Sequence, residues 1–271
     1  MNSNNNANID DNESDVDATT NDRYSHIDPS ILAACAKLAS ITMKGAFGRD
    51  SYSWQRRIVT HLNLMQTHSR CVIPSTTLLC APTGGGKPLA RDTFAAGQSG
   101  VSVCICPLLA LGADQVSKIN AHSCVGDGSI RAYHLDAFKD TLLQQQFCDQ
   151  ICGVSRESQT TIILMTSPHA LIRNKKFYEM FLKLLRQKTL TLLTVDELQL
   201  FVSFGLRFRP EFYALKNKVF SLLKTSDDSD AETKIPVLFM TAFILSAAYF
   251  LYSLFLFVLL LMLFFYVVAS C

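Results

Sequence analysis

The sequence predicts an α/β fold in which a parallel β-sheet is flanked by helices. Short apolar runs alternate with helical or loop stretches, a glycine-rich segment falls at one strand-to-helix turn, and two adjacent carboxylates follow a later strand. This alternation is typical of a parallel sheet with right-handed crossovers. The predicted strands are Thr76–Cys80, Val101–Cys106, Thr161–Thr166, Thr191–Val195 and Val237–Met240, and the clearest helices are Thr141–Cys148 and Lys175–Lys188.

The N-terminal region, residues 1–28, is acidic and rich in Asn, Asp and Ser. It has too few apolar side chains to offset the entropy lost on ordering, so we expect a disordered tail, with no signal peptide. The pair Asp28-Pro29 then predicts the cap of a helix that runs to about Lys44. This helix opens a segment of N-terminal helices that extends over residues 29–75.

The nine cysteines do not show the spacing of a metal site. Cys104 and Cys106 lie in a predicted buried strand, while Cys148 and Cys152 have no partner pair at zinc-finger spacing. We therefore expect free buried thiols and a reducing, intracellular compartment.

The formal net charge of +2 is too small to imply nucleic-acid binding. A binding surface would have to be a local basic patch. The candidates are Arg207 with Arg209, and Arg173 with Lys175 and Lys176.

The glycine-rich segment, residues 81–87, is predicted to bind phosphate. A strand precedes it, a helix from Leu89 to Ala96 follows it, and Lys87 comes directly after three glycines. Backbone N–H groups of Thr83, Gly84, Gly85 and Gly86 would close around phosphate oxygens, and Lys87 would reach the terminal phosphates. An ordinary glycine turn is the alternative.

Pro88 stands where a phosphate-binding loop normally has Ser or Thr as a Mg²⁺ ligand. Proline is tolerated in the first turn of a helix but supplies no hydroxyl. We expect nucleotide binding to survive and hydrolysis to suffer.

Asp196 and Glu197 follow the apolar run Leu192–Val195 and resemble a Walker B element. Polar residues that end a buried parallel strand emerge at the carboxyl edge of the sheet, where ligands bind. Asp196 would hold Mg²⁺ and Glu197 would orient or deprotonate the attacking water. The alternative is a helix N-cap, but a glycine loop about a hundred residues upstream favours the catalytic interpretation.

An aromatic segment follows at residues 203–212. Phe204, Phe208 and Phe212 recur at a spacing of four, which alone indicates one face of a short helix. Arg207 and Arg209 lie between them, and aromatics beside guanidinium groups suit stacking on unpaired bases. Phe204, Phe208 and Arg209 are therefore predicted to couple nucleic acid to the nucleotide site.

These segments resemble the RecQ-like DNA helicases of superfamily two. That family follows the acidic motif with a loop of the form Ser-x-Trp-Gly-His-x-Phe-Arg-Pro-x-Tyr. Phe204 stands where Trp is usual and Phe212 where Tyr is usual. The positions that fit are Ser203, Gly205, Phe208, Arg209 and Pro210.

Further family motifs appear in order over residues 45–243, the extent of the first of the family's two RecA-like motor domains. Residues 76–243 would be the ATP-binding helicase domain. The matching segments are Phe47-Gly48 with Tyr52 and Gln55, Cys106-Pro107-Leu108 with Leu111 and Asp114-Gln115-Val116, Thr166-Ser167-Pro168, and Met240-Thr241-Ala242.

The resemblance implies ATP and Mg²⁺ as ligands and single-stranded or forked DNA as partner. In such an enzyme, which moves 3′ to 5′ in DNA repair and recombination, Gln55 would read adenine and Lys87 would contact the β and γ phosphates. A nuclear location follows. The second motor domain, which supplies an arginine finger, has no counterpart in this sequence, so we expect no unwinding by this chain alone.

The C-terminal region, residues 244–271, departs from this pattern. No charged side chain occurs from Pro236 to Cys271, and Phe250–Ala269 is a run of twenty residues suited to a membrane-spanning helix. A buried core helix is the alternative. The run begins where the family would continue to its second motor domain, so a truncated or misread gene product is one interpretation.

Two other functions compete with the helicase interpretation. One is a non-enzymatic, tail-anchored membrane protein with a degenerate nucleotide-binding domain, which Pro88 and the apolar run favour. The other is a different P-loop ATPase.

Overall fold

The computed structural model describes residues 27–48, 50, 52–67, 76–121, 130–200, 210–225 and 235–242. Its centre is a six-stranded sheet in the order β1-β6-β5-β2-β4-β3, in which every neighbouring pair is parallel. The predicted α/β fold with a parallel sheet is confirmed. The strands are β1 (Thr76–Cys80), β2 (Gly100–Ile105), β3 (Ile130–His134), β4 (Thr161–Thr166), β5 (Leu190–Val195) and β6 (Val237–Thr241).

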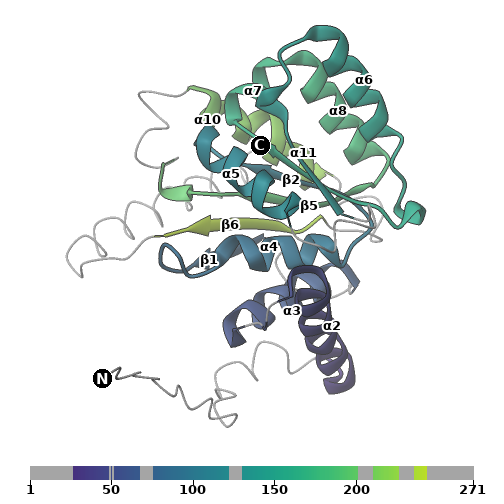
Figure 1. Cartoon of the computed structure of the whole chain (residues 1–271), viewed down its shortest axis with the longest axis vertical. Coiled ribbons are helices and arrows are strands. Elements are labelled where there is room, and N and C mark those ends of the chain that lie inside the picture. Colours follow the sequence, from purple (N-terminus) through teal and green to yellow (C-terminus); the bar gives the residue numbers. More distant parts are fainter. Residues whose placement is uncertain are drawn as a thin grey trace, which may run out of the picture.

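Helices cover both faces of the sheet (Figure 1). On one face lie α4 (Lys87–Ala96) and α5 (Leu109–Asn120), with α2 (Pro29–Phe47) and α3 (Ser53–Thr67) packed beside α4. The opposite face carries α6 (Thr141–Cys152), α7 (Pro168–Arg173), α8 (Lys175–Arg186), and the consecutive α10 (Pro210–Leu215), π-helical η4 (Lys216–Phe220) and α11 (Ser221–Thr225). The short 3₁₀ turns are η2 (Leu135–Ala137) and η3 (Arg156–Ser158).

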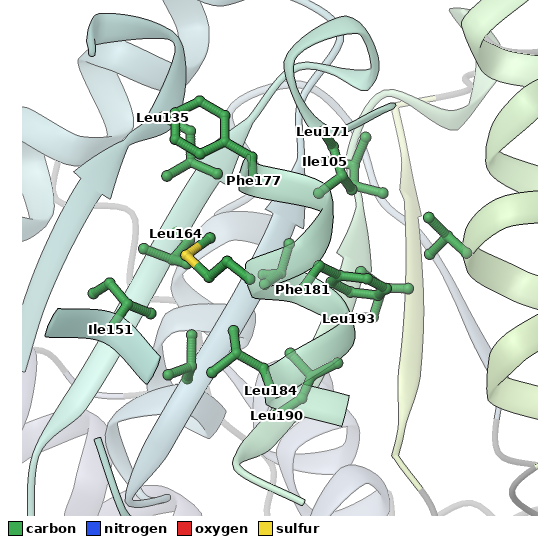
Figure 2. Close-up of a cluster of buried hydrophobic side chains, with 14 of the residues drawn as sticks. Ile105, Leu135, Ile151, Leu164, Leu171, Phe177, Phe181, Leu184, Leu190 and Leu193 are labelled. Carbon is green, nitrogen blue, oxygen red and sulfur yellow. The ribbon is translucent and has the colours of Figure 1, made fainter. Parts of the chain in front are cut away.

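The largest hydrophobic cluster lies between the sheet and α6 and α8 (Figure 2). Phe177, Phe181 and Leu184 of α8 are almost fully buried in it. All residues of β2, β4 and β5 are also buried, because helices cover both faces of these strands. Such strands read as continuous apolar runs, which is why the sequence predicts them well.

Two helices extend beyond their predicted ends, whereas α8 ends at Arg186, two residues before the predicted end at Lys188. The first helix continues past Lys44 to Phe47 and ends at Gly48, whose left-handed backbone (φ 62°) lets its N–H bond the Lys44 carbonyl. Similarly, α6 continues to the buried Cys152, and the Asp140 carboxylate caps its start. Buried side chains in the last turns explain both extensions.

The two ends of the chain fall mostly outside the described residues. Of the tail predicted over residues 1–28, only Ile27 and Asp28 are described, and Ile27 is buried while Asp28 caps α2. The C-terminal run Phe250–Ala269 is not described. Within the described ranges, α2 is the one helix long and apolar enough, by length and composition alone, to cross a membrane.

Candidate functional site

The glycine-rich loop joins β1 to α4, in the predicted strand-to-helix context. Gly84 and Gly86 have left-handed backbone angles, with φ of 78° and 81°. The left-handed backbone favours glycine at Gly86, and a Cβ atom there would lie 2.6 Å from Nε2 of Gln55, so the Gln55 side chain would have to shift. Pro88 lies in the first turn of α4, as expected.

Lys87 is buried and its side chain turns back over the loop. Its Nζ atom donates to the carbonyl oxygens of Ala81 (2.8 Å) and Pro82 (3.2 Å). The loop carbonyls thus stabilise the ammonium group. A phosphate oxygen would have to replace them for Lys87 to contact a nucleotide.

The structure brings Gln55 of α3 against the same loop. Its Nε2 atom donates to the Gly86 carbonyl (3.1 Å), while its Oε1 atom accepts from the Tyr52 N–H (3.0 Å). Gln55 is 1% exposed. Both ends of its amide are therefore engaged by the protein.

The acidic pair lies at the carboxyl end of β5. Asp196 is 2% exposed; its Oδ1 accepts the Glu197 N–H (2.9 Å), and its Oδ2 accepts from Nε2 of Gln115 (3.2 Å). Glu197 has a φ of 50°, a left-handed conformation that costs a non-glycine residue about 1–2 kcal/mol. Such strain clusters at functional sites.

Hydrogen bonds connect β6 to both the acidic pair and the glycine loop. Nε2 of Gln199 donates to Glu197 Oε2, and Gln199 Oε1 accepts from the Thr241 hydroxyl (2.7 Å). The Thr241 carbonyl in turn accepts the Ala81 N–H (3.2 Å). The carboxyl ends of β1, β6 and β5 thus form one connected edge. Gln199 was not predicted, because one polar residue after an acidic pair carries no signal of its own.

A surface cavity of about 330 Å³ lies along α7 and the start of α8. Arg173, His169 and Lys139 are among its lining residues, and the first two lie 3.3 and 3.4 Å from Oε1 of Glu211. The three residues of the predicted basic patch make different contacts. Arg173 lines the cavity, whereas Lys175 pairs with Glu179 and Lys176 donates to the Thr141 carbonyl.

The coupling residues Phe204, Phe208 and Arg209 lie outside the described residues, as does Arg207. The described part resumes at α10, which begins with Pro210. Their predicted role is therefore untested by the geometry.

Cys104, Cys106, Cys148 and Cys152 are buried and form no disulfide, as expected, whereas Cys80 at the end of β1 is exposed and Cys35 of α2 is half-buried. Burial raises the pKa of Cys106 and of Cys148 to about 11, which keeps both thiols protonated at neutral pH. Within the described ranges, no group of three or more His, Cys, Asp or Glu side chains is arranged to hold a metal ion.

Comparison with known proteins gives sequence matches to DNA helicases. The chain is 26% identical over 174 residues to the ATP-dependent DNA helicase Q5 of Mus musculus and 25% identical over 176 residues to that of Rattus norvegicus. Each match covers 64% of this chain and 16% of the relative. No family model matches.

Solved structures of helicases also align with the chain. The crystal structure of DUF1998 helicase MrfA aligns with 80% of this chain and 29% of its own, at 15% identity and a TM-score of 0.48. Its complex with DNA and AMPPNP aligns with 76% of this chain and 26% of its own, at 18% identity and a TM-score of 0.48. The UvsW helicase from bacteriophage T4 aligns with 72% of this chain and 53% of its own, at 11% identity and a TM-score of 0.41.

The sequence matches are to DNA helicases. They cover one part of a much longer helicase, so they indicate a resemblance to a motor domain and not to a whole enzyme. The chain resembles the motor domain of RecQ-like DNA helicases.

Proposed function

We propose that this chain is the first motor domain of a RecQ-like helicase, and that it binds ATP with Mg²⁺ and single-stranded or forked DNA. The observation that carries the proposal is the connected edge of β1, β6 and β5. There the glycine loop, the acidic pair and Thr241 are joined through hydrogen bonds. Ligands of open parallel sheets bind outside the carboxyl ends of the strands.

ATP binding would replace the contacts that Lys87 and Gln55 make with the glycine loop by contacts with the nucleotide. Lys87 leaves the carbonyls of Ala81 and Pro82 for the β and γ phosphates, and the N–H groups of residues 83–86 cradle the phosphates. Gln55 releases the Gly86 carbonyl and reads adenine. The positive end of α4 adds to the attraction for phosphate.

The residues present fit a magnesium ion held mainly by nucleotide and water. Mg²⁺ prefers oxygen ligands and usually takes one or two carboxylates together with phosphates. The Asp196 carboxylate, which Gln115 and the Glu197 N–H hold in place, supplies the protein oxygen. When bound, the ion neutralises charge on the phosphates. Glu197 orients the attacking water and accepts its proton, whereas the side chain of Pro88 offers no oxygen.

Changing Pro88 to serine should raise ATP hydrolysis about tenfold, equivalent to about 1.4 kcal/mol of transition-state stabilisation. The physical reason is the restored hydroxyl ligand, and ATP binding should change less. The measurement is phosphate release by the full-length chain with single-stranded DNA and an added second motor domain. Pro88→Ala is the matched control, because it removes the ring without adding a hydroxyl. Equal rates for the two variants would contradict this account of the metal site.

DNA binding is assigned to the aromatic segment. Phe204 and Phe208 would stack on bases, and Arg209 would contact phosphate and couple DNA binding to Glu197. Phe204→Ala and Arg209→Ala should each weaken binding of single-stranded DNA by about 1–3 kcal/mol without changing the thermal midpoint. Fluorescence anisotropy with a labelled oligonucleotide and a thermal melt test both statements. A destabilised Phe204→Ala variant with unchanged DNA affinity would show that Phe204 packs in the core and does not bind DNA.

The activity of a whole helicase needs parts that the matched region does not include. The chain spans 16% of the length of its curated relatives. We propose a nuclear location from the helicase resemblance. The alternative is a tail-anchored, non-enzymatic protein, favoured by Pro88 and by the apolar run Phe250–Ala269.

A further inference from the structure

Arg91 of α4 is a charged side chain buried almost completely, at 1% exposure. Its Nε atom donates to Oδ1 of Asp92 (2.7 Å), and its Nη2 atom lies 2.6 Å from the same oxygen. Burial opposes the charge of Arg91, yet the neighbouring carboxylates and Cys104 raise its pKa above the ordinary value. A buried charge is tolerated only when it is paired, and here the partner is the adjacent residue of the same helix.

The pairing with Asp92 uses Nε and Nη2 of Arg91, and Nη1 makes other contacts. Nη1 donates to Oε1 of Gln115 at 2.9 Å and to the sulfur of Cys104 at 3.1 Å. Gln115 lies on α5 and is 6% exposed. Arg91 therefore joins the helix that follows the phosphate loop to the helix that follows β2.

The donor and acceptor chemistry fixes the orientation of the Gln115 amide. A guanidinium can only donate, so the amide oxygen must face Arg91, and the Asp196 carboxylate can only accept, so the NH₂ group must face Asp196. The geometry agrees at both ends, at 2.9 and 3.2 Å. Reversing the amide would set donors against the guanidinium and an oxygen against the carboxylate.

We propose that Arg91 is a positioning residue that acts through Gln115 to hold the Asp196 carboxylate ready for magnesium. This inference rests on the proposed function, because Arg91 would support the magnesium site proposed there. Groups that orient a metal ligand commonly change metal affinity about 10- to 100-fold when they are removed. The phosphate contacts of the glycine loop do not pass through Arg91, so nucleotide binding without the metal should be independent of it.

The test uses the full-length chain and the fluorescent analogue MANT-ATP, titrated in EDTA and then with increasing Mg²⁺. The variant Arg91→Met/Asp92→Asn removes both charges together, which avoids a lone buried carboxylate. Gln115→Met breaks the connection but leaves the ion pair intact, so it decides the question if the double variant does not fold. Thr93→Val is the matched control, because Thr93 is fully buried in α4 and its hydroxyl has no hydrogen-bond partner among the described residues.

The Mg²⁺ concentration that gives half of the maximal increase in MANT-ATP affinity should rise about tenfold, both in the double variant and in Gln115→Met. Affinity in EDTA should match that of the wild type, and Thr93→Val should match it in both conditions. Equal weakening with and without Mg²⁺, or an unchanged Mg²⁺ response in Gln115→Met, would overturn the positioning role and leave Arg91 as packing. Wild-type protein that does not bind MANT-ATP would instead overturn the proposed function, and this inference with it.

Discussion

Replacing Phe181 with alanine is expected to lower the free energy of unfolding by about 3–5 kcal/mol, the usual cost of removing a buried phenylalanine ring. Phe181 is 1% exposed and lies in the cluster between α8 and the sheet (Figure 2). Surrounding side chains such as Leu193 cannot fill the space, because the strands behind them are fixed by neighbours on both sides. In a domain of this size the thermal midpoint should fall by roughly 6–20 °C.

The matched control is Tyr213→Ala, which removes an aromatic ring that is 59% exposed on α10. Its effect should stay within about 0.5 kcal/mol, as for most surface changes. Thermal melts of both variants, followed by circular dichroism, separate the two cases. A midpoint for Phe181→Ala within the range of the Tyr213→Ala control would show that the cluster around α8 does not hold the fold together.

The central strands could be predicted from the sequence because their environment leaves a simple pattern. β4 has its predicted bounds, β5 begins one residue earlier than predicted, and β2 both begins and ends one residue earlier than predicted. Burial on both faces makes each a mostly apolar run, broken only by small hydroxyl residues such as Ser102 and Thr194, and polar residues then mark the carboxyl end. The position of Asp196 follows from the same rule.

The edge strand β3 was not predicted, and the reason is physical. It pairs with β4 alone, and its sequence mixes buried Ile130 and Ala132 with exposed Arg131, so no continuous apolar run marks it. Strand position depends on a partner that lies about thirty residues away in the chain. A local pattern carries little of that information.

The candidate site was predictable in its parts but not in its connections. Strand and helix context place the glycine loop and the acidic pair on one edge of the sheet. The bonds from Lys87 and Gln55 to loop carbonyls, and from Gln199 to Thr241, depend on contacts between distant segments. The fully buried Arg91 is the clearest case, since a charged residue in a helix usually indicates a solvated face.

The most direct test of nucleotide binding at the glycine loop is the affinity of the full-length chain for MANT-ATP with Mg²⁺, compared between wild type and Lys87→Ala. A charged hydrogen bond contributes about 1.5–3 kcal/mol, so the loss of Lys87 should weaken binding by about 10- to 100-fold. Lys118→Ala is the control, because Lys118 is an exposed lysine on α5 that pairs with Asp114. Wild-type binding that falls in Lys87→Ala and persists in Lys118→Ala is the predicted result. Equal affinity in all three proteins would contradict the assignment of this loop as the phosphate site.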